Sequence, residues 1–139
     1  MPVLTFELRF ETKGEVEMVD ITEEVRGFVK RSGLSSGLVC IHCPGATGAV
    51  TTIEYEDGLL EDFPAMLEAI APKEKVYQHH LRWHDGNGHS HVRASLMGPS
   101  LTIPFVNGEP VLGTWQQIAF VELDNKNRDR KLVIQVMGE

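Results

Sequence analysis

The sequence predicts an α+β fold, a single compact domain with a mostly antiparallel β-sheet or sandwich and two main helices. Segments with alternating or β-branched residues outnumber segments with helical spacing of apolar residues. Four of these segments follow one another in the last third of the chain, separated by polar turns. Because strands joined by short turns pair antiparallel, the sheet is expected to be largely antiparallel.

The first half of the chain is expected to supply four strands and both helices. VLTFELRF at 3–10 alternates apolar and polar side chains, which is typical of a half-buried strand. Further strands are expected at 15–19, 37–43 and 49–56. A helix is expected to begin at Asp20 and to end at Gly33, and a second one spans 57–71.

The second half is expected to contain strands only. They are HVRASL at 91–96, LTIPFV at 101–106, GTWQQIAFVEL at 113–123 and KLVIQVM at 131–137. Asn107-Gly108 and the polar run DNKNRDR at 124–130 supply the turns.

Length and charge limit the classes of function. The chain has 139 residues, 42% of them hydrophobic, and a formal net charge of −7. One domain over residues 1–139 is expected, and neither a membrane span nor a secretory signal is seen, so the cytoplasm is the expected location. The acidic balance disfavours nucleic acid as a partner and favours a small molecule.

Two cysteines, Cys40 and Cys43, form a C-x-x-C motif within a predicted strand. At this spacing a strand directs the two sulfurs to opposite faces, and no second cysteine pair exists to complete a zinc site. They are predicted to be inert structural cysteines.

The segment HHLRWHDGNGHSH at 79–91 holds five of the six histidines. If the strand at 91–96 begins early, His89 and His91 lie on one face, and the turn at 85–88 brings His79 or His80 beside them. Three imidazoles would bind a first-row metal, so the predicted ligands are His89, His91 and either His79 or His80. A histidine-rich loop without a ligand and metal-free acid–base chemistry are the alternatives.

Other polar groups could face the same site. Glu54, Asp57 and Asp62 could supply carboxylates, although helix capping and solvation account for them equally well. The small residues of loop 44–48 could surround a phosphate, or could form only a tight turn. Arg82 and Arg93 are expected to be surface charges.

Several stretches together resemble one known family. They are Y-x-H ending at His79, W-x-D-G-N-G-x-S-H ending at His91, RASLMGPSLTIPF at 93–105 and NGEPVLGTWQQIAFVELD at 107–124. Over nearly the whole chain the sequence is similar to the YjbQ-like family, whose members are often described as secondary thiamine-phosphate synthase enzymes. The resemblance implies a small α+β homotrimer with a histidine-built metal or anion site.

The resemblance also implies site residues. It supports His79 and His91 first, His89 through a subgroup pattern, and Glu54, Asp57 and Asp62 as family carboxylates. One departure is clear, because Gly45 and Ala46 stand where many members have histidine and threonine.

These patterns together predict a metal-binding enzyme that acts on a phosphorylated small molecule, with thiamine-phosphate synthase activity implied by the resemblance. In that reaction a thiazole phosphate nitrogen displaces pyrophosphate from an aminopyrimidine diphosphate. The predicted cofactor is a divalent metal, Zn²⁺ if histidines bind it and Mg²⁺ if the carboxylates do. A non-catalytic trimeric protein that binds a metal or an anion, and a zinc-dependent hydrolase, are the alternatives.

Overall fold

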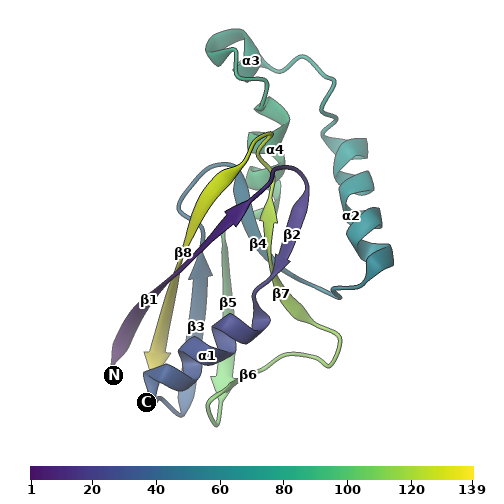
Figure 1. Cartoon of the computed structure of the whole chain (residues 1–139). Helices are drawn as coiled ribbons and strands as arrows, with labels where there is room; N and C mark the ends of the chain where they lie inside the picture. Colours follow the sequence, from purple (N-terminus) through teal and green to yellow (C-terminus); the bar gives the residue numbers. More distant parts are fainter.

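The computed structural model describes residues 1–139 as two antiparallel sheets and four helices (Figure 1). The strands are β1 (Val3–Thr12), β2 (Glu17–Asp20), β3 (Ser36–His42), β4 (Gly48–Ile53), β5 (Ser100–Val106), β6 (Glu109–Pro110), β7 (Gln117–Glu122) and β8 (Arg128–Gly138). The helices are α1 (Thr22–Ser32), α2 (Asp57–Ile70), α3 (Gln78–Trp83) and α4 (Gly88–Met97). The predicted α+β class is confirmed, with two helices more than expected.

The larger sheet has the strand order β1-β8-β3-β5-β6. Its longest pairing joins the two ends of the chain, from Val3 opposite Met137 to Thr12 opposite Arg128. On β1 the half-buried residues are Leu4, Phe6, Leu8 and Phe10, which is the alternation seen in the sequence. The other face of β1 is exposed.

The smaller sheet, β2-β7-β4, lies between two apolar clusters. Alternate residues of β7 divide between them: Ile118 and Phe120 join the main core with α1 and the larger sheet, and Val121 joins the second cluster. That second cluster also contains Leu67 of α2 and Ala94 of α4. Helices α2 and α4 therefore cover the outer face of the smaller sheet.

The strand predicted at 91–96 is wrong, because these residues belong to helix α4. Its buried residues include His89, Ser90, Arg93 and Ala94, which recur at helical spacing. Ala, Ser, Leu and Met in this segment favour a helix over a strand. Arg93, expected at the surface, is buried and donates from Nε to the carbonyl oxygen of Ala71, at 3.0 Å.

Smaller boundaries also differ from expectation. The strand expected at 113–123 begins only at Gln117, and the one expected at 49–56 ends at Ile53. Gly33 ends α1 in the left-handed conformation, as predicted. Both cysteines are free, Cys43 is buried as expected, and burial raises the pKa of its thiol. Cys40 is partly exposed.

Candidate functional site

Two of the predicted ligands, His79 and His91, lie side by side. His79 comes from α3 and His91 from α4, and their ring centroids are 4.3 Å apart. The turn between the helices reverses the chain through the left-handed conformations of His84 and Gly86. Asp85 in that turn places Oδ1 3.3 Å from Nδ1 of His79. The DGNG turn therefore places a carboxylate and a second imidazole each beside His79.

The third predicted ligand, His89, does not join them. Residues two apart on a helix point in nearly opposite directions, so His89 faces the interior while His91 faces outward. His89 is fully buried, and its Nε2 lies 2.6 Å from Oε2 of Glu15, whose other oxygen is 2.7 Å from Nζ of Lys73. The proposed side-by-side placement of His89 and His91 was wrong because it required a strand.

Within one chain, no three His, Cys, Asp or Glu side chains gather as a metal-binding group. The remaining histidines have other contacts. Nε2 of His80 accepts a hydrogen bond from the backbone N–H of Gly88 at 2.8 Å. His84 ends α3, and Nδ1 of His42 lies 2.5 Å from Oγ of Ser100. A single chain thus offers two adjacent histidines to a metal ion.

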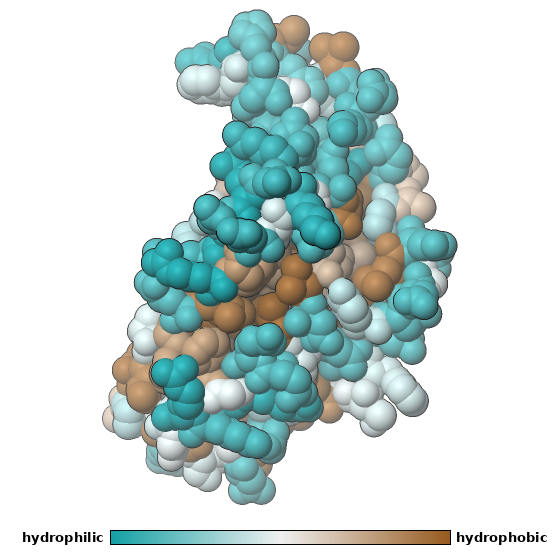
Figure 2. Space-filling view, in the orientation of Figure 1, coloured by the Kyte–Doolittle hydropathy of each residue, from teal (hydrophilic) through white to brown (hydrophobic).

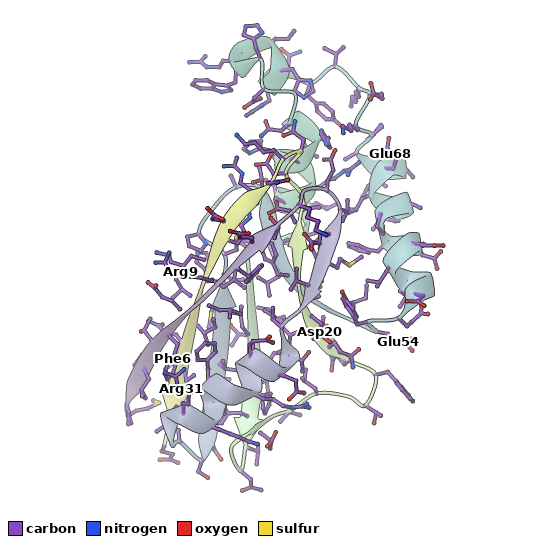
Figure 3. All side chains as sticks on the ribbon, in the orientation of Figure 1. Phe6, Arg9, Asp20, Arg31, Glu54 and Glu68 are labelled. Carbon is purple, nitrogen blue, oxygen red and sulfur yellow. The ribbon has the colours of Figure 1, made fainter.

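The predicted carboxylates lie away from the histidines. Glu54, Asp57 and Asp62 are all exposed, in the connection before α2 and in its first half. Figure 3 shows Glu54 at the opposite end of α2 from Glu68, and Glu68 is the residue that pairs with Arg93 of α4, at 2.8 Å. Helix α2 is 14 residues long, about 20 Å at 1.5 Å per residue. Glu56, rather than Asp57, caps it.

His91 opens onto a cleft of about 460 Å³, a size suited to a small ligand. The cleft is formed by loop 44–47, the start of α4 and the first residues of β8. Its lining residues are Pro44, Gly45, Ala46, Thr47, Asp85, Asn87, His91, Arg128, Asp129 and Arg130. Almost all of them are polar or small, so the cleft suits a hydrophilic ligand.

Two buried carboxylates hold the arginines of the cleft in place. Glu122 accepts hydrogen bonds from Nε and Nη2 of Arg130, and Asp124 accepts one from Nε of Arg128 at 2.8 Å. Thr47 joins the two pairs, because its hydroxyl donates to Asp124 and accepts from Nη2 of Arg130, each at 3.0 Å. The side chains of both acids are completely buried. The guanidinium groups are therefore fixed before any ligand arrives.

The protonation states follow from these surroundings. Burial lowers the pKa of His91, and the neighbouring His79 lowers it further, so the imidazole is neutral at pH 7. Burial disfavours the ionised form of Asp124, but hydrogen bonds from Arg128, Asn125, Asn87 and Thr47 outweigh it and lower its pKa to about 2. At pH 7 the site therefore contains a neutral His91 beside an ionised Asp124.

Sequence reasoning missed the two acid–arginine pairs that form the floor of the cleft, Glu122 with Arg130 and Asp124 with Arg128. The run at 124–130 was interpreted only as a turn, although it contains three of the four charged partners. The available signal was the spacing, since Glu122 and Asp124, and likewise Arg128 and Arg130, are two residues apart. Residues two apart on a strand share a face, so this spacing indicates that the two acids and the two arginines can face one another across the connection between β7 and β8.

Comparisons with known proteins agree over the whole chain. Residues 6–139 match the family model described as UPF0047 protein YjbQ-like. A UPF0047 protein of Methanothermobacter thermautotrophicus is 40% identical over 139 residues, covering 100% of this chain and 95% of the relative. UPF0047 protein YugU of Bacillus subtilis is 35% identical over 132 residues, covering 94% and 97%.

Solved structures share the fold. A crystal structure of a protein of unknown function from Sulfolobus solfataricus superposes with a TM-score of 0.89 at 30% identity, covering 99% of this chain and 100% of that one. One from Clostridium acetobutylicum gives a TM-score of 0.87 at 36% identity, covering 95% and 99%. By sequence and by fold, this chain belongs to the YjbQ-like UPF0047 family.

Proposed function

We propose that this protein is an enzyme that acts on a phosphorylated small molecule, with His91 transferring a proton at the edge of the cleft. The observation that carries the proposal is the placement of a partly buried, neutral imidazole beside two fixed arginines. A neutral imidazole accepts a proton near pH 7, and fixed guanidinium groups stabilise negative charge on phosphate. His79 lies beside both Asp85 and His91. A neutral His79 can stabilise a protonated His91, whereas a protonated His79 would repel it.

A divalent metal, with Zn²⁺ favoured over Mg²⁺, belongs to a second form of the proposal, in which His79 and His91 bind the ion and His91 does not transfer the proton. Imidazole nitrogens suit Zn²⁺, which binds three protein ligands in catalytic sites. Since His79 and His91 are two, the substrate or a second copy of the chain has to supply another ligand. Glu54, Asp57 and Asp62 can act at this cleft only if a second copy brings them there.

Thiamine-phosphate synthesis is the specific reaction that we propose within this class. It releases a diphosphate, which can accept hydrogen bonds from the free arginine N–H groups, and the cleft has a suitable size. His91 can accept a proton only from the aminopyrimidine, because the attacking thiazole nitrogen carries none. No membrane-spanning helix is present in the chain. We keep the cytoplasm as the proposed location of this activity.

The test combines turnover with metal content. Tag-free protein should convert an aminopyrimidine diphosphate and a thiazole phosphate, or hydrolyse a member of a phosphate-ester panel. His91→Ala should lower kcat by about 100-fold or more, in keeping with the loss of a proton-transfer group. Elemental analysis of the parent and of the His79→Ala, His91→Ala double variant should show metal lost on mutation.

His42→Ala is the matched control, because His42 lies on the larger sheet outside the cleft and should leave kcat unchanged. A pH profile adds a second criterion. Activity that needs neutral His91 should fall as pH drops below an apparent pKa lower than 6.5, the ordinary value for histidine. Equal turnover by the parent and by His91→Ala would refute the proposal and leave a binding protein as the alternative.

A further inference from the structure

The arginines of the cleft each keep one nitrogen free. Arg128 contacts Asp124 through Nε and Nη2, and Arg130 contacts Glu122 and Thr47 through the same two nitrogens. Nη1 of either arginine makes no hydrogen bond within the chain. A guanidinium whose other nitrogens are held by a buried carboxylate is oriented, so the direction of its free N–H groups is fixed.

Loop 44–47 lies directly over one of these free nitrogens. A Cβ built on Gly45 would be 3.3 Å from Nη1 of Arg130, closer than a side chain comfortably approaches. Gly45 also has a φ of 154°, which favours glycine. Glycine here allows the backbone to approach the guanidinium and leaves space that a ligand atom can share.

The same loop has unpaired backbone donors. The N–H groups of Gly45, Ala46 and Thr47 make no hydrogen bond to any other group of the chain. Successive unpaired N–H groups form concave anion sites in many proteins. Three unpaired backbone donors and two free guanidinium nitrogens therefore belong to residues that line the cleft.

Acidic residues also line the cleft, and their positions matter. Asp85 lies beside His79, and Asp129 alternates with the arginines on β8, so that it points to the other face of the strand. Glu122 and Asp124 are occupied by the arginines. Recognition at this end thus depends on directed N–H donors rather than on an excess of positive charge.

We infer that the phosphoryl group of the ligand binds at the free Nη1 atoms of Arg128 and Arg130 and the backbone N–H groups of residues 45–47. This inference deepens the proposed function and rests on it for the phosphorylated substrate class. The phosphoryl group occupies the loop end of the cleft, and the organic part extends toward His91. The absence of a side chain at Gly45 leaves that end open to the phosphate.

The experiment is a binding titration that needs neither turnover nor metal. Chelator-treated, ¹⁵N-labelled full-length protein is titrated with inorganic phosphate at constant ionic strength, and amide resonances are followed. The amides of residues 45–47 should shift and saturate. Arg128→Gln should weaken binding about tenfold, the loss of one charge-assisted hydrogen bond. Arg130→Lys should do the same, because lysine keeps the charge beside Glu122 and lacks Nη1.

Arg26→Gln is the matched control, since this arginine of α1 pairs with Glu23 and Glu109 outside the cleft. It should bind phosphate as the parent does. Thermal melting shows which variants fold. If Arg130→Lys does not fold, the phosphate affinity of Arg128→Gln alone tests the inference. Unshifted loop amides, equal affinity in Arg128→Gln, or binding that appears only after metal is added would each overturn the inference. If phosphate still shifts the amides of residues 45–47 but no substrate is turned over, only the proposed function is overturned.

Discussion

At the scale of single residues, Asp124 organises the floor of the cleft. Its buried carboxylate accepts hydrogen bonds from the side chains of Thr47, Asn87 and Arg128 and from the N–H of Asn125. These donors lower its pKa from 3.8 to about 2 despite burial. The residue that positions Arg128 is therefore also one that ties the stability of the fold to pH.

Asp124→Asn should lower the free energy of unfolding at pH 7 by about 2 kcal/mol, because a neutral amide loses the charge-assisted hydrogen bonds that the carboxylate accepts. The folded pKa lies below the unfolded value, so the carboxylate contributes its full stability above pH 3.8 and loses it as pH falls through about 2. The difference in free energy of unfolding between the parent and the variant should thus shrink by about 2 kcal/mol between pH 7 and pH 2.

Urea unfolding at several pH values measures both effects. Asp129→Asn serves as the comparison, since this exposed neighbour should change stability by less than about 0.5 kcal/mol. A difference between the parent and Asp124→Asn that stays constant with pH would contradict the assignment of the low pKa.

At the scale of elements, helices α3 and α4 determine which histidines meet. Gly88 lies at their junction, where its N–H donates to Nε2 of His80. A Cβ on Gly88 would be 2.6 Å from Cβ of Tyr77 and 3.1 Å from Nε2 of His80. Only glycine allows the start of α4 to lie this close to α3.

Gly88→Ala should therefore push α3 away from α4, at a cost of about 1–3 kcal/mol for overpacking. Hydrogen exchange should become faster in residues 78–84, and the His79–His91 contact should loosen. Gly27→Ala is the control, because nothing lies within 4 Å of a Cβ at that helical glycine. It should keep or raise stability by up to about 1 kcal/mol. Unchanged exchange in α3 would count against this account of the junction.

The sequence predicted the elements with strong periodicity and missed those set by tertiary contacts. The alternation of β1 and the helical spacing of α2 were sufficient, because each pattern arises from burying one face. For α4 the sequence predicted a strand at 91–96, the first of four consecutive strands, although the composition favours a helix. Its buried face contains His89, Ser90 and Arg93, so polar burial concealed the helical pattern.

For the site, the sequence identified His79 and His91 but not their neighbours. A cluster of histidines is visible in any sequence. The ion pair between Glu122 and Arg130, in contrast, depends on how β7 of one sheet and β8 of the other are placed. The ionic floor could be found only once β7 and β8 were placed. The loop 44–47 was considered as a phosphate site in sequence, and the structure adds the arginines beneath it.

At the scale of the whole molecule, α3 and the segment before it protrude from the body (Figure 1). Val76, Leu81 and Trp83 are 73%, 59% and 62% exposed, and Figure 2 shows apolar atoms at this end of the molecule among hydrophilic ones. Lys75 and Arg82 lie among them. Residues 54–72, in contrast, have six acidic side chains and no Lys or Arg. Apolar and complementary charged surfaces of this kind suit contact between copies of one chain.

We expect a homotrimer, with a mass three times the 15.5 kDa of the chain in sedimentation equilibrium. Because the two complementary surfaces differ, repeated contact between them is head-to-tail, which gives a ring when the rotation closes and no twofold dimer. The number of three subunits comes from the resemblance to the family. Trp83→Ser with Leu81→Ser should weaken association by at least about tenfold. Trp115→Ser, which removes another exposed tryptophan, should not. A parent protein that sediments as a monomer at micromolar concentration would contradict the expectation.

The pairing of β1 with β8 has a consequence for how the chain is made. These strands lie at the two ends of the sequence and align over ten residue pairs. During synthesis, β1 therefore leaves the ribosome long before β8, its only partner in the sheet, has been made. Until then, the apolar face formed by Phe6, Leu8 and Phe10 has no neighbouring strand. Because β8 also carries Arg128 and Arg130, the sheet and the floor of the cleft are both completed only after β8 has been synthesised.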